Sequence, residues 1–88
     1  MGATLEMTRV SAKSWKEAVD KVVEVSTNYY GMNPYSGSFN TITDWNECKK
    51  SFESEDDFED WVCDNADKRE AYVWKKGNKY LICGWCAC

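Results

Sequence analysis

Histidine is absent from this chain of 88 residues, and proline occurs only once, at Pro34. The lack of histidine removes the residue that most often acts as a general acid or base in enzymes. The sequence also lacks a serine or cysteine nucleophile motif, a phosphate-binding loop and a dinucleotide-binding fingerprint. We therefore predict that the protein is not an enzyme.

Positive charge and long apolar segments are also scarce. Eleven lysine and arginine residues stand against 15 aspartate and glutamate residues, which gives a net charge of −4. This balance argues against nonspecific binding to nucleic acids or anionic membranes, and it fits a cationic protein partner. No segment approaches the roughly 20 apolar residues of a membrane span. Residues 1–6 lack the basic and apolar parts of a signal peptide, so we expect a cytoplasmic protein.

The residues that are present suffice for one small folded domain. A chain of 88 residues builds a single core near the lower size limit for independent stability, so we take residues 1–88 as one domain. The composition is 43% hydrophobic and 30% charged, which is typical of globular proteins. Aromatic residues make up 15% of the chain and supply much buried area per residue.

The first third of the chain predicts a strand followed by a helix. Residues 4–10 alternate apolar and polar side chains, as a half-buried strand does. Ser14 and Glu17 have the spacing of a capping box, which predicts a helix over residues 15–30 that ends at Gly31. Seven residues at helical spacing form its expected buried stripe: Trp15, Ala18, Val19, Val22, Ser26, Tyr29 and Tyr30.

The middle of the chain is harder to assign. Residues 32–37 contain proline and glycine and predict a turn. Residues 38–45 are rich in β-branched and aromatic side chains, which predicts a second strand. Residues 46–53 fit either a loop or a short additional strand.

The last part of the chain predicts a helix and a hairpin. Ser54 is an expected N-cap, and acidic residues in the following turn favour a helix over residues 55–67. Residues 70–76 and 79–87 predict two strands joined at Gly77 and its neighbour. The element order β-α-β-α-β-β predicts an α+β fold. Its simplest form is a two-layer sandwich, with a four-stranded sheet and both helices on one face.

The five cysteines raise the question of a metal site. In the cytoplasm, cysteines are more often thiols or metal ligands than disulfides, and an odd number prevents complete pairing. Side chains alternate along a strand, so Cys86 and Cys88 are expected to point one way and Cys83 the other. Cys48, Cys63, Cys86 and Cys88 would then form a closed structural zinc site, with Cys83 in the core. The alternatives are that all five are reduced core or edge residues, or that two form a disulfide or redox pair.

The second predicted helix carries an unusual density of negative charge. The predicted partner-binding residues are Glu55, Asp56, Asp57, Glu59, Asp60 and Asp64. One reading is a solvated helix face whose first-turn acids suit the helix dipole. The other is an electrostatic surface for a partner rich in lysine and arginine, such as the nucleic-acid channel of a nuclease.

Three short motifs lie along most of the chain: Tyr30-Gly31 after the first predicted helix, Tyr35-Ser36-Gly37-Ser38, and the hydrophobic run of residues 80–87. Together they resemble a group of small phage and prophage proteins of unassigned activity. At three positions the group tends to have a bulky apolar residue, an alanine and a serine, in that order. This chain has Cys83, Cys86 and Cys88 there. The resemblance therefore implies that position 83 is a core position and that the cysteines at 86 and 88 are additions.

The resemblance also suggests a function by analogy. Small acidic phage proteins without enzyme motifs include inhibitors of host defence, among them anti-CRISPR proteins that block Cas nucleases. A fold alone does not establish such a function. We therefore expect a non-enzymatic inhibitor that binds a host defence nuclease, with a Cas9-type effector as the leading candidate. The alternative is a phage accessory or structural protein whose acidic face only interacts with solvent.

Overall fold

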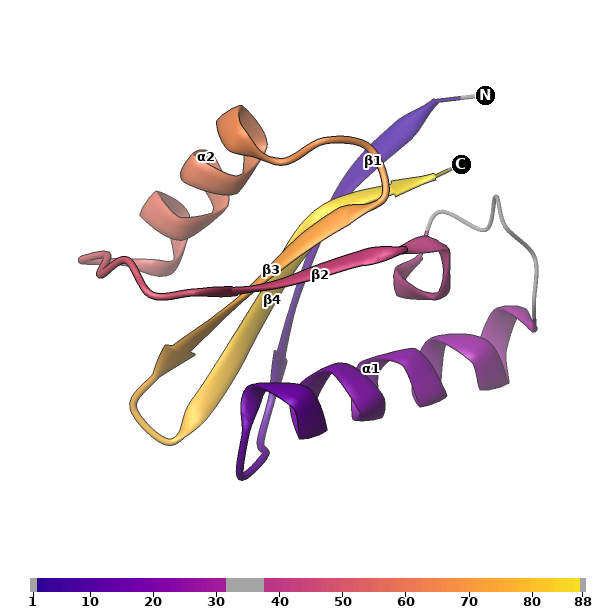
Figure 1. Cartoon of the computed structure of the whole chain (residues 1–88), viewed down its shortest axis with the longest axis horizontal. Coiled ribbons are helices and arrows are strands. Elements are labelled where there is room, and N and C mark those ends of the chain that lie inside the picture. The colour runs from indigo at the N-terminus through magenta and orange to yellow at the C-terminus, as the bar shows by residue number, and fades with distance from the viewer. Residues whose placement is uncertain (1, 32–37, 88) are drawn as a thin grey trace.

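The computed structural model describes residues 2–31 and 38–87. The elements in chain order are β1 (Ala3–Val10), α1 (Trp15–Tyr30), the 3₁₀ helix η1 (Phe39–Thr41), β2 (Asp44–Cys48), α2 (Glu55–Asn65), β3 (Glu70–Lys76) and β4 (Lys79–Ala87). Figure 1 shows the two helices on either side of a twisted sheet. The predicted α+β class and the order β-α-β-α-β-β are confirmed. Within the described residues, no helix is long and apolar enough to cross a membrane.

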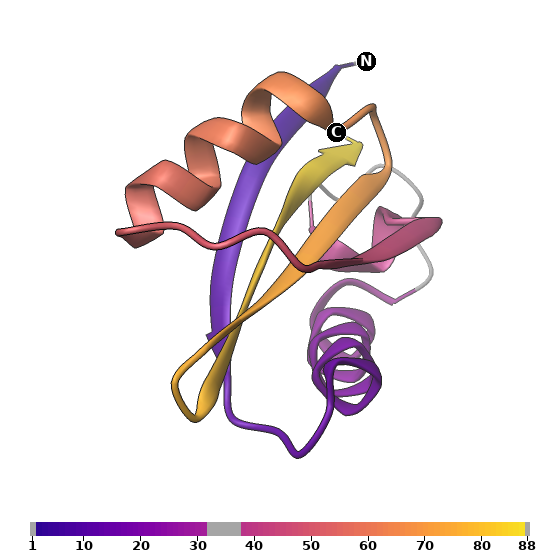
Figure 2. The same ribbon diagram turned by 60° about the vertical axis from the view of Figure 1, so that its left-hand side comes forward.

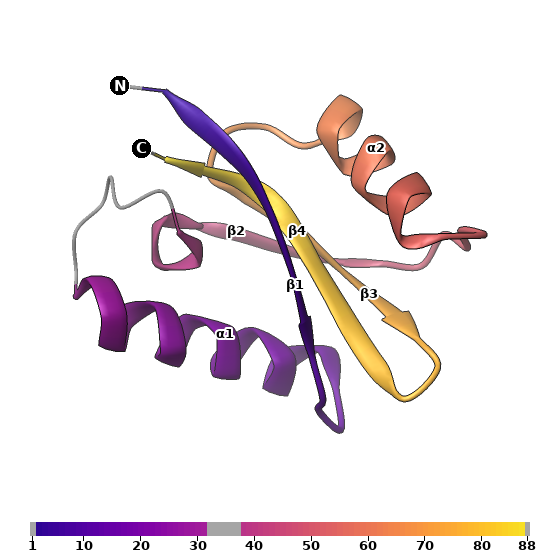
Figure 3. The same cartoon turned by 180° about the vertical axis from the view of Figure 1, so that it is seen from behind.

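The sheet has four strands in the order β1-β4-β3-β2. The C-terminal strand β4 lies inside the sheet and pairs antiparallel with β1 on one side and with β3 on the other. Strand β2 runs parallel to β3, and helix α2 forms the crossover between them. Figure 3 shows β1 at one edge, lying against β4 along its whole length.

Both helices begin as the sequence predicts. The Ser14 hydroxyl accepts a hydrogen bond from the Glu17 N–H at 3.2 Å, and the Ser54 hydroxyl accepts one from the Asp57 N–H at 3.2 Å. Gly31 ends α1 with a positive φ of 64°, and its N–H donates to the Thr27 carbonyl. The predicted turn over residues 32–37 lies outside the described residues.

The predicted strand over residues 38–45 is wrong. Phe39–Thr41 form the short helix η1, and the strand begins later and runs over Asp44–Cys48. One local and one long-range hydrogen bond favour the turn. The Thr41 hydroxyl donates to the Ser38 carbonyl at 2.6 Å, and the Asn40 N–H donates to the hydroxyl of Ser26 on α1 at 2.9 Å.

The expectation that both helices cover one face of the sheet is also wrong. Ala18 and Val22 of α1 pack with Val73 and Ile82 in one core cluster. In a second cluster, Phe58, Trp61 and Val62 of α2 and the following Ala66 pack with residues of the sheet that include Trp74 and Leu81. Adjacent residues of β4 thus belong to opposite faces, and Figure 2 shows the sheet lying between the helices. The molecule therefore has three layers, α1, sheet and α2.

The end of β4 is fixed to the sheet and to η1. Gly84 lies opposite Ala71 of β3, and a Cβ atom at Gly84 would lie 2.5 Å from the Ala71 Cβ atom. The buried Thr41 hydroxyl accepts a hydrogen bond from the Ala87 N–H at 3.0 Å. These contacts hold the C-terminal strand in place up to its last described residue.

Candidate functional site

Helix α2 presents its two faces to different environments. Phe58 and Val62 are fully buried against the sheet. The acids Asp56, Asp57, Asp60 and Asp64 are exposed, and Glu59 is half-buried. The helix therefore lies on the sheet by its apolar stripe and displays a row of carboxylates outward. Five of the six predicted partner-binding acids belong to this row, which we call the acidic face (Asp56, Asp57, Glu59, Asp60 and Asp64).

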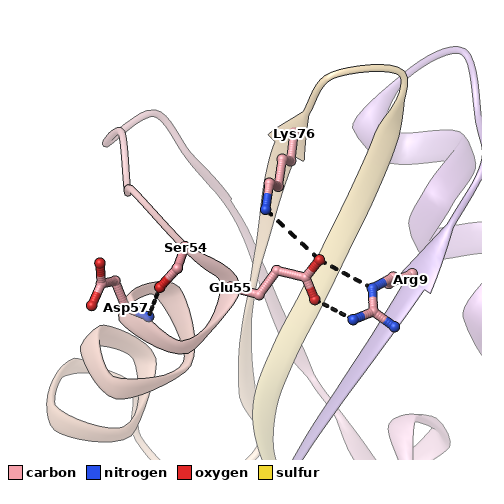
Figure 4. Close-up of polar contacts among 5 residues, drawn as sticks. All are labelled: Arg9, Ser54, Glu55, Asp57 and Lys76. Atoms are coloured by element: carbon pink, nitrogen blue, oxygen red, sulfur yellow. Dashed lines mark hydrogen bonds and ion pairs between the residues drawn. The ribbon is translucent and has the colours of Figure 1, made fainter.

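The sixth predicted acid, Glu55, is engaged within the protein. Its carboxylate forms a two-pronged ion pair with the Arg9 guanidinium of β1 and lies 3.8 Å from the Lys76 ammonium of β3. Figure 4 shows Glu55 directed at these two cations, whereas Asp57 points away from them. Glu55 therefore connects the start of α2 to two strands, and we separate it from the acidic face.

The electrostatics of Glu55 follow from these contacts. The hydrogen bond from Arg9 lowers the pKa of the Glu55 carboxyl, and the positive charges of Arg9, Lys76 and Lys79 act in the same direction. The pKa of Arg9 is raised for the same reason. At neutral pH both groups are charged, so the contact is a full ion pair.

Among the predicted zinc ligands that the structure describes, Cys48 and Cys86 lie on opposite faces of the sheet. Cys48 packs in the cluster on the α2 side of the sheet, and Cys86 packs in the cluster on the α1 side. Cys63 is exposed on α2, and Cys88 lies outside the described residues. In the part of the chain that the structure describes, no group of three or more Cys, His, Asp or Glu residues has the geometry for a metal ion. The expected set assumed that α2 and Cys86 share one side of the sheet, whereas α2 covers the opposite face.

The predicted role of Cys83 is confirmed. Its side chain is fully buried on the α2 side, opposite in direction to Cys86, as strand alternation requires. Burial raises the pKa of the Cys83 thiol to about 12 and also raises the pKa of Cys48. Both thiols are therefore protonated at neutral pH and pack as small apolar side chains.

The structure also contains a groove that the sequence did not predict. It lies between β1 and α1, has a volume of about 720 Å³, and is lined by residues that include Val25 and Tyr29. The expectation that Tyr29 belongs to the buried stripe of α1 is wrong, because this residue is 81% exposed.

The comparisons with known proteins give no relative. No protein-family model, characterised protein or solved structure matches the chain. Arguments about its function therefore start from its own residues.

Proposed function

We propose that this protein is a non-enzymatic, phage-encoded inhibitor that acts in the host cytoplasm and binds a host defence nuclease, with a Cas9-type effector as the leading candidate. The observation that carries the proposal is the acidic face of α2. Its carboxylates are turned away from the core, and α2 is held in place by packing on the opposite side.

Charge complementarity supports this partner class. A nuclease holds its nucleic acid in a positively charged channel that contacts the phosphate backbone. A rigid helix with a row of carboxylates offers such a channel negative charges at fixed spacing. Complementary charges speed association and select partners by sign.

The cost of the acidic face to the fold also supports a role in binding. Asp60 lies four residues from both Asp56 and Asp64 on α2. Like charges at this spacing destabilise a helix by roughly 0.2–0.5 kcal/mol per pair. The interactions among the acids of the acidic face therefore do not stabilise α2. Glu55, in contrast, stabilises the fold through its ion pair with Arg9.

A cleavage assay tests the proposal. Increasing amounts of the protein are added to a Cas9-type nuclease, and wild type is expected to inhibit at near-stoichiometric ratios and less strongly at high salt. The variant D57N/E59Q/D60N is expected to inhibit poorly while its melting temperature stays close to that of wild type, because only Asp57 of the three lies in the first turn of α2. The matched control D20N/E24Q/D44N removes the same charges from exposed positions outside α2 and should inhibit like wild type.

Two results would contradict the proposal. Undiminished inhibition by D57N/E59Q/D60N would exclude the acidic face as the contact surface. Absence of any association with a nuclease in host lysate would favour the alternative, a phage accessory or structural protein whose acids serve solubility.

Zinc binding stays a separate proposal. Because the sheet separates Cys48 from Cys86, one ion held by both is incompatible with this fold, and a site would involve the cysteines of one face only. Native mass spectrometry with and without a chelator tests it. One zinc ion per chain that is lost in C63S but kept in C86S would place the site on α2, whereas a spectrum without zinc would contradict the proposal.

A further inference from the structure

Strand β1 is a long edge strand with little of the usual protection against pairing. It pairs only with β4, over eight residues in an unbroken register from Ala3 opposite Ala87 to Val10 opposite Tyr80. Proteins commonly protect such edges with a bulge, a proline, charged side chains or a very short strand. The sequence of β1 contains neither proline nor lysine, and the ladder has no bulge. Its charged residues are Glu6 and Arg9, and Arg9 is already paired with Glu55. The opposite edge strand, β2, has only five residues.

The groove between β1 and α1 adjoins this edge. Its lining includes Thr8 and Val10 from β1 and Val25 and Tyr29 from α1. Val25 is 57% exposed and Tyr29 is 81% exposed, and they are the two exposed large hydrophobic residues in the described part of the chain. An apolar groove therefore lies beside a strand whose outer backbone groups are unpaired within the described residues. An extended polypeptide segment can hydrogen-bond to the edge of β1 and place its side chains in the groove at the same time.

We propose that the occupant is a second copy of this chain, whose β1 pairs antiparallel with β1 of the first copy. The dimer contains one continuous eight-stranded sheet, twice the four strands of each copy. A twofold axis normal to the sheet leaves both α1 helices on the same face. The exposed Val25 and Tyr29 of each copy then line the side that the other copy occupies.

The charges of β1 restrict the register of this pairing, and we propose the register centred on Thr8 because it also gives Glu6 an opposite charge. A twofold axis through Thr8 places Thr8 opposite its own symmetry mate, a favourable cross-strand pair. It also places Glu6 opposite the partner's Val10. A register centred on Glu6 is excluded, because two like charges would then lie directly opposite each other.

In this register, Glu6 meets a positive charge. Glu6 lies opposite Gly84 in β4, two residues from Ile82, and therefore on the α1 side of the sheet. It is exposed and has no ion-pair partner among the described residues. The Lys21 ammonium donates to the Ser11 carbonyl at 2.7 Å, directly after Val10 in the chain, and it also lies 3.4 Å from the Glu17 carboxylate of α1. Glu6 therefore comes beside the partner's Lys21, and the symmetry forms this contact twice.

Charge reversal tests this pairing without altering the backbone. Sedimentation equilibrium at concentrations up to ~100 μM detects even weak dimers. Wild type is expected to reach twice the chain mass of 10.2 kDa. E6K and K21E should each weaken the dimer by about tenfold or more, because each places like charges together across the interface. The double variant E6K/K21E restores opposite charges and should recover most of the affinity.

Controls separate association from folding. E53K changes an exposed acid elsewhere by the same charge and should dimerise like wild type. Circular dichroism checks that each variant is folded. The affinity of E6K/K21E is compared with that of K21E alone, because both variants lose the contacts of Lys21 with Ser11 and Glu17.

Three results would overturn the proposal. The first is a wild-type protein that is monomeric throughout the concentration range. The second is a double variant no stronger than the single ones. The third is a dimer that tightens in E6K or E6Q, which would show that Glu6 protects the edge from pairing. The proposal does not depend on the nuclease partner, since it concerns the isolated protein.

Discussion

An added methyl group at Gly84 would collide with β3. The nearest atoms to such a group would be the Ala71 Cβ atom at 2.5 Å and the Glu70 carbonyl oxygen at 2.6 Å. Both belong to the neighbouring strand, so relief requires β3 and β4 to move apart. We therefore predict that G84A lowers the free energy of unfolding by about 1–3 kcal/mol, the usual cost of overpacking a core. Chemical denaturation followed by fluorescence measures this change.

A second variant distinguishes this collision from other effects of the substitution. In A71G/G84A the opposing methyl group is removed, so the double variant should be more stable than the sum of the two single changes predicts. A G84A protein as stable as wild type would mean that the strands lie farther apart than the structure describes. Strict additivity would mean that the collision involves the Glu70 carbonyl oxygen and not the Ala71 methyl group.

The cysteines show how much the sequence reveals at the scale of residues. Alternation along a strand predicted that Cys83 and Cys86 lie on opposite faces, and this is confirmed. The same reasoning did not place Cys48, because strand β2 was not predicted with its correct bounds. A ligand set drawn from several elements depends on how those elements pack, which spacing in one segment does not encode.

At the scale of elements, the connection of α2 to the sheet depends on the ionisation of Glu55. Arg9 and Lys76 stabilise the ionised form of the Glu55 carboxyl, so its pKa is lowered in the folded state. A lowered pKa adds stability that is present above the unfolded-state value of about 4.3 and is lost as the pH falls through the folded-state value. We therefore predict that wild type is more stable than E55Q at neutral pH. The difference should shrink below about pH 4.

Unfolding free energies of both proteins across this pH range provide the measurement. E53Q changes an exposed acid for which no ion pair appears in the described part of the chain, so its difference from wild type should stay small at every pH. A difference between wild type and E55Q that persists unchanged in acid would contradict the ion-pair account.

Elements with strong local signals were predictable. Ser14 and Ser54 mark the starts of both helices, and Gly77 marks the hairpin turn with a φ of 64°. The segment over residues 38–45 was not predictable, because its aromatic and β-branched composition favours a strand. Its actual conformation depends on Ser26, which lies on α1 and hydrogen-bonds to the Asn40 N–H.

At the scale of the whole molecule, the placement of the helices was the main error in the expected fold. Residues 80–83 are all apolar or aromatic and all buried. A strand covered on both faces has such a continuous run, whereas a strand with one solvent face alternates. The run therefore already indicated a sheet with a helix on each side, in conflict with the two-layer expectation.

The three-layer arrangement also determines which surfaces are available. Helix α1 covers one face of the sheet, and α2 covers the other and carries the acidic face. The groove beside β1 lies on the α1 side, so it and the acidic face belong to opposite sides of the sheet. A dimer formed through β1 leaves the acidic face of each copy free for a partner.

The central claim is that the acidic face of α2 binds a cationic groove of a Cas9-type nuclease, and equilibrium affinity tests it most directly. Dissociation constants are measured for wild type, D57N/E59Q/D60N and D20N/E24Q/D44N at ~0.05 M and ~0.2 M salt, where screening differs strongly. The account predicts that wild type weakens as salt rises, that D57N/E59Q/D60N binds at least about tenfold more weakly at low salt, and that the control matches wild type. Equal affinities for all three proteins, or equal losses in both variants, would contradict it.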